Sequence, residues 1–276
     1  MTPRFDRARI LGIVNITADS FSDGGKYLDP GNAVLHARAL IAAGADIIDL
    51  GPASSHPDAQ PVTAAQEIAR LEPVVAALSD TGIALSIDSF QPETQLYAVH
   101  KNISYINDIQ GFPDPEIYPD LARSDCKLIV MHSVQSQGGA TRVATDVDGL
   151  YARITGFFET RLLALTDAGI SKDRIILDPG MGFFLGNVPD ASLSILGKLR
   201  QLKQRFGLPM LISVSRKSFL QQVSGAKAAQ AGAASLAAEL YAAFAGADYI
   251  RTHDAGSLRQ GLAVWSALRK FDTNLR

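Results

Sequence analysis

Eight short apolar runs recur along this 276-residue chain, and polar residues follow each run at once. The clearest example, residues 175–184, reads Ile-Ile-Leu-Asp-Pro-Gly-Met-Gly-Phe-Phe. Its apolar part ends at Asp178 and a Pro-Gly pair follows, which is typical of a buried strand that ends in a turn. One such acid can simply cap its own turn. Repetition of the pattern predicts instead that many strands share one polar rim. The other polar strand ends are Asp49, Asp88, Asn107 with Asp108, His132, Arg216 with Lys217, and Arg251 with His253.

Segments with helical spacing separate these runs. Strands are expected at residues 10–16, 46–50, 85–88, 105–109, 127–132, 174–177, 209–214 and 247–251. Helices are expected at residues 33–43, 64–78, from 92, from 115, and at 150–168, 191–206, 231–244 and 257–271. Strict alternation of strand and helix indicates an α/β protein with a parallel sheet.

Eight strand–helix units fit closure into a (β/α)8 TIM barrel, which typically needs about 250 residues. We therefore expect one domain spanning residues 1–276. A doubly wound open sheet is the alternative, but such sheets usually carry a glycine-rich turn after the first strand. Residues 15–19 contain no glycine, which favours the barrel. The polar rim then lies at the carboxyl end of the barrel, where such folds place their chemistry.

Composition excludes several classes of protein. The net charge is -2 and no basic run is present, so no nucleic-acid partner is expected. No apolar run is long enough to span a bilayer, and the polar N-terminus does not resemble a secretory signal. The single Cys126 excludes an internal disulfide and is expected to be a buried structural thiol. We expect a cytoplasmic protein without a membrane partner.

The rim residues indicate a ligand with two unlike ends. Carboxylates and an amide can bind the edge of a heterocycle, because a carboxylate accepts two parallel bonds and an amide both donates and accepts. Basic groups and hydroxyls can hold an anion such as phosphate. The first set is Asp88, Asn107 and Asp178; the second is Lys217, Arg251 and His253, with Ser215 and Ser218. The alternative is that these charges pair with one another across the barrel mouth.

Six segments, each at an expected strand end, resemble those of the dihydropteroate synthases. They are residues 12–25, 87–89, 107–108, 177–180, 215–218 and 251–254. The resemblance extends from Ile10 to about Lys270. It implies a transferase of folate biosynthesis that condenses 6-hydroxymethyl-7,8-dihydropterin pyrophosphate with p-aminobenzoate, giving 7,8-dihydropteroate and pyrophosphate.

The same resemblance implies a role for each matching residue. Asp178 would hold the pterin edge, with Asp88, Asn107 and Lys217 around the ring and Met131 lining the pocket. Asn15, Arg251 and His253 would hold the pyrophosphate, with Mg²⁺ as cofactor near Asn15. The residues expected to act in catalysis are Asp88, Lys217, Arg251 and His253. Substrate contacts are also expected from Ser54, Ser55, Phe183, Phe184 and Ser215. A homodimer is the family expectation.

Two loops depart from the family pattern. Residues 54–58 read Ser-Ser-His-Pro-Asp where Ser-Thr-Arg-Pro-Gly is usual, and residues 182–186 read Gly-Phe-Phe-Leu-Gly where Gly-Phe-Gly-Lys is usual. Both departures resemble the sulfonamide-resistant subgroup, so sulfonamide insensitivity is expected, with Phe184, Phe183 or His56 as its cause. The alternative is neutral loop variation, with Phe184 packed on the helix expected at 191–206.

Other functions remain open at this point. A pterin-dependent (methyltetrahydrofolate) methyltransferase shares the barrel and the pterin-binding acids, but it needs no pyrophosphate site. A Schiff-base aldolase could use Lys217, and borohydride trapping of a carbonyl substrate would reveal its imine. A non-catalytic pterin-binding module would not need both ends of the site.

Overall fold

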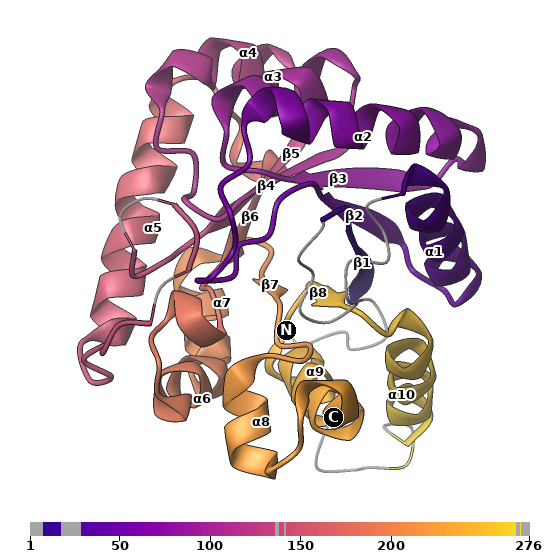
Figure 1. Cartoon of the computed structure of the whole chain (residues 1–276). Coiled ribbons are helices and arrows are strands. Elements are labelled where there is room, and N and C mark those ends of the chain that lie inside the picture. The colour runs from indigo at the N-terminus through magenta and orange to yellow at the C-terminus, as the bar shows by residue number, and fades with distance from the viewer. Residues whose placement is uncertain (1–7, 18–28, 136–137, 141, 269–270, 272–276) are drawn as a thin grey trace.

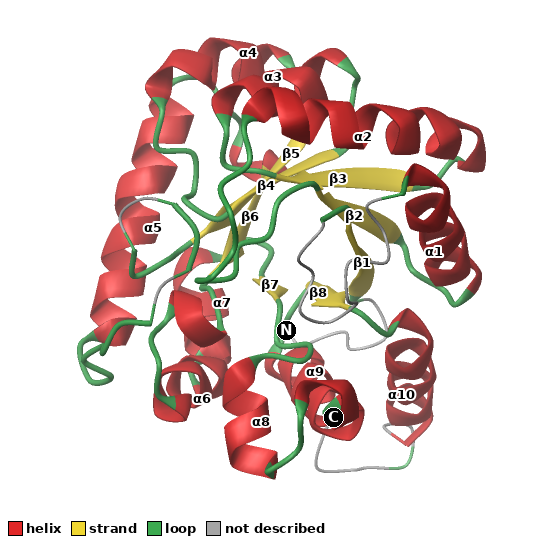
Figure 2. Ribbon diagram, in the orientation of Figure 1, coloured by secondary structure: helices red, strands yellow, loops and turns green. Residues whose placement is uncertain are grey.

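The computed structural model describes residues 8–17, 29–135, 138–140, 142–268 and 271. In these ranges the chain forms eight parallel strands surrounded by helices (Figures 1 and 2). The strands are β1 (Arg9–Asn15), β2 (Ile47–Gly51), β3 (Ala84–Asp88), β4 (Tyr105–Asp108), β5 (Lys127–Met131), β6 (Ile175–Asp178), β7 (Leu211–Ile212) and β8 (Tyr249–Thr252). The helices are α1 (Pro30–Ala42), α2 (Ala64–Leu78), α3 (Pro92–His100), α4 (Tyr118–Arg123), α5 (Leu150–Asp167), α6 (Pro189–Gly197), α7 (Leu199–Phe206), α8 (Ser218–Ser224), α9 (Gly232–Ala245) and α10 (Ala255–Leu268).

The strands close into a barrel. Their order in the sheet is β6-β5-β4-β3-β2-β1-β8-β7. The two ends of this sheet meet because Leu177 of β6 forms a parallel bridge with Met210. In addition, the Leu177 N–H donates to the Pro209 carbonyl at 2.9 Å. The predicted (β/α)8 barrel is confirmed.

Most element boundaries follow the sequence pattern. Helix α2 spans the predicted residues 64–78, and it begins with a capping box in which Thr63 and Gln66 bond each other's backbone N–H. The predicted helix at 191–206 is wrong, because the backbone at Lys198 leaves helical geometry and separates α6 from α7. Strand β7 is two residues long rather than six, and the residues after it turn towards the barrel mouth.

Side chains that point into the barrel form layers, because alternate strand residues face opposite sides. An apolar layer fills the interior. It consists of Leu11, Ile47, Tyr105, Ile129, Ile176, Leu211 and Tyr249. Two residues further along the same strands lie Ile13, Asp49, Asn107, Met131, Asp178, Ser213 and Arg251. The strand period therefore places these side chains in one layer at the carboxyl end.

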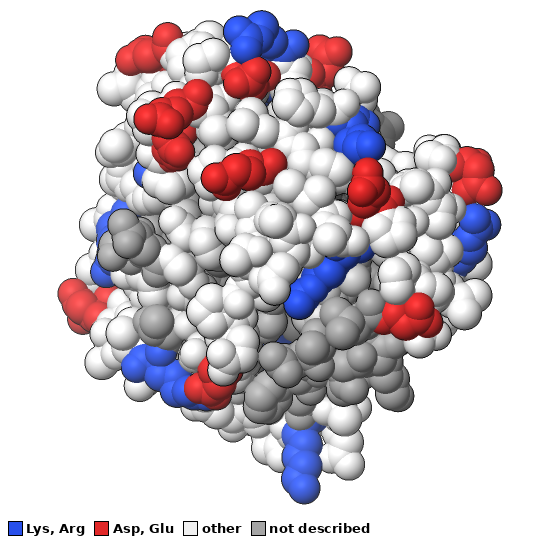
Figure 3. All heavy atoms as spheres, turned by 45° about the horizontal axis from the view of Figure 1, so that its top comes forward, with Lys and Arg blue, Asp and Glu red and all other residues white. Residues whose placement is uncertain are grey.

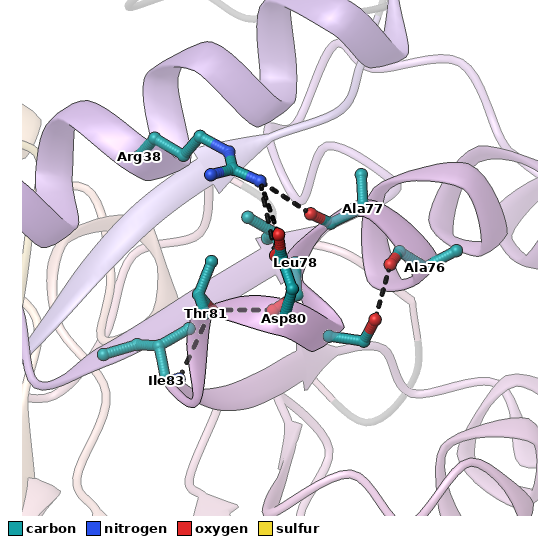
Figure 4. Close-up of polar contacts among 8 residues, drawn as sticks. Arg38, Ala76, Ala77, Leu78, Asp80, Thr81 and Ile83 are labelled. Atoms are coloured by element: carbon teal, nitrogen blue, oxygen red, sulfur yellow. Dashed lines mark hydrogen bonds and ion pairs between the residues drawn. The ribbon is translucent and has the colours of Figure 1, made fainter.

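The helices are tied to one another on the outside of the barrel. Arg38 of α1 donates through Nη2 to the Ala77 carbonyl of α2 at 3.2 Å and to Asp80 at 3.3 Å (Figure 4). Thr81 closes the same turn by donating to the Leu78 carbonyl at 2.7 Å. On the face in Figure 3, Lys and Arg side chains are interspersed with Asp and Glu. Within the described residues, no helix has the length and apolar character needed to cross a bilayer.

Candidate active site

A cavity of about 430 Å³ opens at the carboxyl end of the barrel. This volume lies in the range of small-molecule sites. The wall is formed by strand ends and by the loops after β2, β6 and β7. Most of the predicted site residues line it, namely Asn15, Ser54, Ser55, Asp88, Phe183, Phe184, Ser215, Ser218, Lys217, Arg251 and His253. The predicted residues Asn107, Met131 and Asp178 are buried in the barrel layer that also holds Arg251, and they are not among the residues that line the cavity. We call these three residues the floor of the site.

Arg251 forms the centre of a buried ion-pair network. Its Nε donates to Asp49 Oδ2 at 2.6 Å, and its Nη2 donates to Asp88 Oδ2 at 2.7 Å. The side-chain exposures of Arg251, Asp49 and Asp88 are 14%, 0% and 16%. Burial raises the pKa of Asp88 above its ordinary range, against the pull of the Arg251 guanidinium, and the neighbouring Asp49 raises it further. The alternative that rim charges pair across the barrel mouth therefore holds for Arg251.

The floor of the site is polar and incompletely bonded. Asp178 Oδ1 accepts a bond from the Gly180 N–H at 2.8 Å. Burial raises the pKa of Asp178 to about 6, although the Gly180 bond and the positive charges of Lys217 and Arg251 oppose that shift. Asn107 Oδ1 is buried and has no hydrogen-bond partner among the described residues. A buried polar atom without a partner is a candidate contact for a ligand.

Gly180 shapes the turn that follows Asp178. Its φ of 75° lies in the left-handed region, and a Cβ here would meet the His132 carbonyl at 2.3 Å. Only glycine fits such a position without a backbone shift. The His132 N–H also donates to the Asp178 carbonyl at 2.8 Å. The Pro-Gly pair therefore does more than end the strand, because it fixes β6 against the end of β5.

Lys217 lies between the floor and the aromatic loop after β6. Its Nζ is 5.0 Å from the centre of the Phe184 ring. Burial lowers the pKa of Lys217 to about 8, and Arg251 lowers it further while Asp178 and Asp88 oppose the shift. The preceding Arg216 has a φ of 57°, and its N–H donates to Ser235 Oγ at 2.9 Å. A non-glycine residue in the left-handed region is often found at functional sites.

His253 follows β8 and is joined to Ser215, which follows β7. The His253 N–H donates to Ser215 Oγ at 3.2 Å, and His253 Nδ1 lies 3.1 Å from the same oxygen. Burial lowers the pKa of His253 well below its ordinary value, and the charges of Arg216 and Arg251 act in the same direction. The lowered pKa favours a neutral imidazole at physiological pH, so His253 can contact an anion by hydrogen bonding rather than by charge.

Three loops meet around Phe183. Arg142 makes two bonds to Asp58, at 2.8 and 2.6 Å, which join the loop after β5 to the loop after β2. The Arg142 guanidinium carbon lies 5.6 Å from the Phe183 ring centre. The His56 ring lies edge-on to Phe183 at 6.1 Å between centroids. We call His56, Asp58, Arg142 and Phe183 the loop clasp. The loop clasp includes residues from both loops whose sequences differ from the family pattern, residues 54–58 and 182–186.

Phe184 is more deeply buried than Phe183. Its ring is buried with Ile109, Met131 and Ala140. Phe183 packs against the same cluster but is only partly buried, and its ring also contacts His56 and Arg142 of the loop clasp. The two phenylalanines therefore share one apolar cluster and differ in burial.

Sequence reasoning missed three residues of this region. Asp49 was recognised as a strand end but not as the partner of Arg251, and Arg142 and Glu239 were not connected with the site. The strand period could have indicated Asp49, because it shares the inward face of β2 with Ile47. The predicted motif residues Asp19, Ser20, Phe21, Ser22, Asp23, Gly24 and Gly25 lie outside the described residues. Cys126 is buried as predicted.

The donor set near Asn15 limits how a metal ion could be held. Asn15 lines the cavity and offers one neutral oxygen. Among the described residues, no three His, Cys, Asp or Glu side chains converge as a metal cluster. Mg²⁺ commonly uses few protein oxygens together with water and substrate phosphates. The residues present therefore fit a magnesium ion that arrives with an anionic substrate, rather than one held by the protein alone.

Comparison with known proteins places this geometry in a family. The chain belongs to the pterin binding enzymes, whose family model matches residues 11–253. The type-2 dihydropteroate synthase of Escherichia coli is 56% identical over 261 residues, covering 95% of this chain and 96% of its own.

Two solved structures are similar over nearly the whole chain. Dihydropteroate synthase of Xanthomonas albilineans with 4-aminobenzoic acid has a TM-score of 0.86 and 34% identity, covering 98% of this chain and 99% of its own. The same enzyme with 7,8-dihydropteroate has a TM-score of 0.81 and 33% identity, covering 96% and 95%. Within its family the chain thus falls among the dihydropteroate synthases, transferases of folate biosynthesis. The predicted function is confirmed over the methyltransferase and aldolase alternatives.

Proposed function

We propose that this cavity joins 6-hydroxymethyl-7,8-dihydropterin pyrophosphate to p-aminobenzoate with the residues in the following roles. The observation that carries the proposal is that buried acceptors, Asp178 and Asn107, share a barrel layer with Arg251, while cations and hydroxyls line the cavity wall. Asp178 and Asn107 on the floor bind the polar edge of the pterin, beside Met131. Asp88 and Lys217 lie between the two ends of the substrate and contact the ring.

The wall is suited to the leaving group. Ser215, Lys217, Arg251 and His253 surround the pyrophosphate and stabilise the negative charge that develops on it. The bond between the pterin methylene carbon and the pyrophosphate oxygen breaks, and its electron pair leaves with the pyrophosphate. The amine nitrogen of p-aminobenzoate then forms a bond to that carbon and loses a proton. Asn15 would hold Mg²⁺, which would supply further neutralising charge.

A coupled binding and turnover experiment tests these roles. The chain is mixed with the pterin pyrophosphate, Mg²⁺ and labelled p-aminobenzoate, and dihydropteroate is measured by chromatography. Asn15→Ala is compared with the parent across a range of magnesium concentrations. We expect the variant to need more magnesium for half-maximal rate. An unchanged magnesium requirement would remove Asn15 from the proposal.

We further propose that the site discriminates against sulfonamides through the loop clasp. The Phe183 ring is held from two sides by His56 and Arg142, and it lines the cavity. A carboxylate is flat, whereas a sulfonamide is tetrahedral and projects a substituent sideways. A rigidly held ring at the cavity wall excludes that substituent by steric clash. Such a clash corresponds to about 1–3 kcal/mol, or roughly 10–200-fold in relative affinity.

Three variants test the discrimination. Phe183→Ala removes the held ring, and deletion of Phe184 with Leu185 restores the shorter loop of the family. Phe90→Ala is the matched control, because Phe90 packs against the same apolar cluster but does not line the cavity. We expect the inhibition constant for sulfamethoxazole to fall at least 10-fold in Phe183→Ala, with a smaller change in KM for p-aminobenzoate. If all folded variants have the same inhibition constant for sulfamethoxazole as the parent, Phe183 and Phe184 do not cause the discrimination. His56 would then be the next candidate.

We also propose that the protein acts in the cytoplasm as a homodimer. Exposed apolar side chains on α10, Val264 and Leu268, support a partner surface there. Light scattering on the purified chain, compared with Val264→Glu, tests the dimer. A parent protein that is monomeric at micromolar concentration would refute it.

A further inference from the structure

A second cavity lies beside helix α5 and is separate from the candidate active site. Its volume is about 260 Å³, and it is bounded by one face of α5 and by the loops that follow β4 and β5 (Figure 1). None of the residues that line it also lines the active-site cavity. The proposed reaction uses none of them. Any ligand of this cavity is therefore recognised by a different set of side chains.

Helix α5 presents two arginines to this cavity. Arg153, Phe157 and Arg161 are spaced by four residues, so they lie on one face of the helix. Arg153 Nη2 donates to the Val134 carbonyl at 2.6 Å, and Arg161 Nη1 donates to the Phe112 carbonyl at 3.1 Å. Carbonyl groups are neutral, and no Asp or Glu is among the described residues that line the cavity. The wall therefore carries positive charge that favours an anion.

Asp108 is a buried acid close enough for the charge of Arg161 to influence its pKa. Burial raises that pKa, whereas its hydrogen bonds and the Arg161 charge lower it. Its Oδ1 accepts from the Gln110 N–H at 2.7 Å, and its Oδ2 accepts from the Phe112 N–H at 2.8 Å and from Gln95 Nε2 at 2.9 Å. Both carboxylate oxygens are therefore engaged by neutral donors rather than by Arg161.

His132 supplies an acceptor to the same cavity. Its Nδ1 lies 3.3 Å from the Pro179 carbonyl oxygen, which can only accept a hydrogen bond, so Nδ1 carries the ring proton. Burial lowers the pKa of His132 to about 4, although the Pro179 bond opposes that shift, and the Arg153 charge lowers it further. The lowered pKa favours a neutral ring at neutral pH, in which the other nitrogen, Nε2, is a hydrogen-bond acceptor.

Two residues that line this cavity each have a buried atom without a hydrogen-bond partner among the described residues. The atoms are His132 Nε2 and Arg161 Nε. His132 is only 1% exposed, and the Arg161 guanidinium carbon lies 5.6 Å from the Phe157 ring centre. A buried acceptor and a buried donor are costly to leave unbonded, because each has lost its bonds to water. A ligand with one donor and one anionic acceptor would satisfy both atoms.

These groups define the chemical class of the ligand. Guanidinium groups bind carboxylates through charge-assisted hydrogen bonds. Nε2 repels a carboxylate oxygen, because both carry lone pairs, but it accepts the proton of a hydroxyl group. An ammonium group could also donate to Nε2, but the charges of Arg153 and Arg161 oppose a cation. A small organic acid that bears a hydroxyl group matches the whole set.

We propose that this second cavity binds a small hydroxycarboxylate, whose carboxylate contacts Arg153 and Arg161 and whose hydroxyl donates to His132 Nε2. The site is distinct from the one that holds the pterin and the pyrophosphate. Its imidazole also connects it to the active site, since the Pro179 carbonyl that bonds Nδ1 belongs to the turn after Asp178.

Calorimetry on the full chain tests the proposal with two dicarboxylates of the same length, L-malate and succinate. Both carry two carboxylates, but only malate has a hydroxyl. We expect malate to bind about 10-fold more tightly than succinate, the equivalent of one hydrogen bond. The product 7,8-dihydropteroate should not displace malate, because it binds in the other cavity. This comparison needs no substitution, so it remains decisive if variants fold poorly.

His132→Asn tests the acceptor. The asparagine amide can still donate to the Pro179 carbonyl, but the side chain is too short to replace Nε2. Malate should lose about 10-fold in affinity, whereas the affinity for succinate should change little.

Arg153→Gln tests the location of the ligand. Arg153 is exposed and bonds one backbone carbonyl, so the fold should tolerate the change. Both acids should bind about 5-fold more weakly to this variant. Arg200→Gln is the matched control, because Arg200 of α7 is also exposed and donates to one carbonyl, that of Phe244, at 3.4 Å. This control should bind malate as the parent does.

The proposal fails in any of three cases. Binding of neither acid by the parent would show that the cavity holds only solvent. Equal affinity for both acids in the parent, or an undiminished preference for malate in His132→Asn, would show that Nε2 is not the acceptor. Unchanged malate binding in Arg153→Gln, or displacement of malate by 7,8-dihydropteroate, would place the ligand elsewhere.

Discussion

Asp49→Asn separates the structural and chemical roles of the ion-pair network. Asp49 is fully buried, and one of its oxygens accepts the Arg251 Nε bond at 2.6 Å while the other has no partner among the described residues. Loss of one partner from a buried ion pair typically costs 3–5 kcal/mol, because the remaining charge is left without compensation. Arg251 would still contact Asp88 at 2.7 Å, so we expect the lower end, about 3 kcal/mol.

An exposed ion pair provides the comparison. Arg38 and Asp80 are also in contact, at 3.3 Å, but their side chains are 49% and 70% exposed (Figure 4). Solvent screening reduces such pairs to about 0–1 kcal/mol. Asp80→Asn should therefore change the free energy of unfolding by less than about 1 kcal/mol. The two substitutions are chemically identical, so the difference between them reports burial.

Urea denaturation followed by circular dichroism measures both variants, and a double-mutant cycle with Arg251→Gln isolates the pair. The coupling energy between Asp49 and Arg251 should exceed that between Arg38 and Asp80 by about 2 kcal/mol. If Asp49→Asn is no less stable than Asp80→Asn, then burial does not govern this interaction and the argument fails.

Removal of Asp49 also has a chemical consequence. Its negative charge raises the pKa of Asp88, so Asp49→Asn should lower that pKa. The substitution also removes one of the two carboxylates that balance the positive charge of Arg251. Pyrophosphate should then bind more tightly to the variant than to the parent, although the variant is less stable. Weaker pyrophosphate binding by a folded Asp49→Asn protein would contradict the assignment of Arg251 to the anion wall.

Other predictions follow from single contacts. Asp178→Asn should weaken binding of a pterin without pyrophosphate by about 1–3 kcal/mol in calorimetry, because an amide donor replaces an acceptor. In the parent this affinity should fall as the pH drops below about 6, where Asp178 takes up a proton, while the asparagine variant should lack that dependence. His253→Ala and Arg251→Ala should weaken pyrophosphate but not pterin binding, and equal losses would indicate a folding role. Gly180→Ala should lower the melting temperature markedly, since its Cβ would lie 2.3 Å from the His132 carbonyl; an unchanged melting temperature would show that the turn adapts.

The fold could be predicted because the pattern within each segment and the order of the segments along the chain indicate the same architecture. Apolar runs buried on both faces, alternating with helices, are compatible with few architectures. The break between α6 and α7 was not predictable from periodicity, because buried apolar side chains continue on both sides of Lys198: Ile195 and Leu196 precede it, and Leu199 and Leu202 follow it. Strand β7 is short for a reason that lies in tertiary structure, since its pairing with β6 is reduced to one bridge at Met210.

The site could be predicted only in part. Strand ends identify residues that reach the barrel mouth, which is why Asp178 and Lys217 were found. They do not identify contacts between loops, such as the bonds of Arg142 to Asp58 across 84 positions of sequence. Nor do they reveal that Glu239, within an alanine-rich helix, turns inward. An acid on a helix is usually solvated, and only the packing of α9 against β8 shows that this one is buried.

The charge balance of the site bears on the proposed need for magnesium. Three carboxylates (Asp49, Asp88 and Asp178) lie close to two cations, Arg251 and Lys217. Arg251 is occupied by two of these acids, and Lys217 loses its proton at a lower pH than an exposed lysine because burial disfavours its charge. Pyrophosphate brings several negative charges to a wall whose own positive charge is largely balanced. Binding it therefore requires additional positive charge, which supports a divalent ion that enters with the substrate.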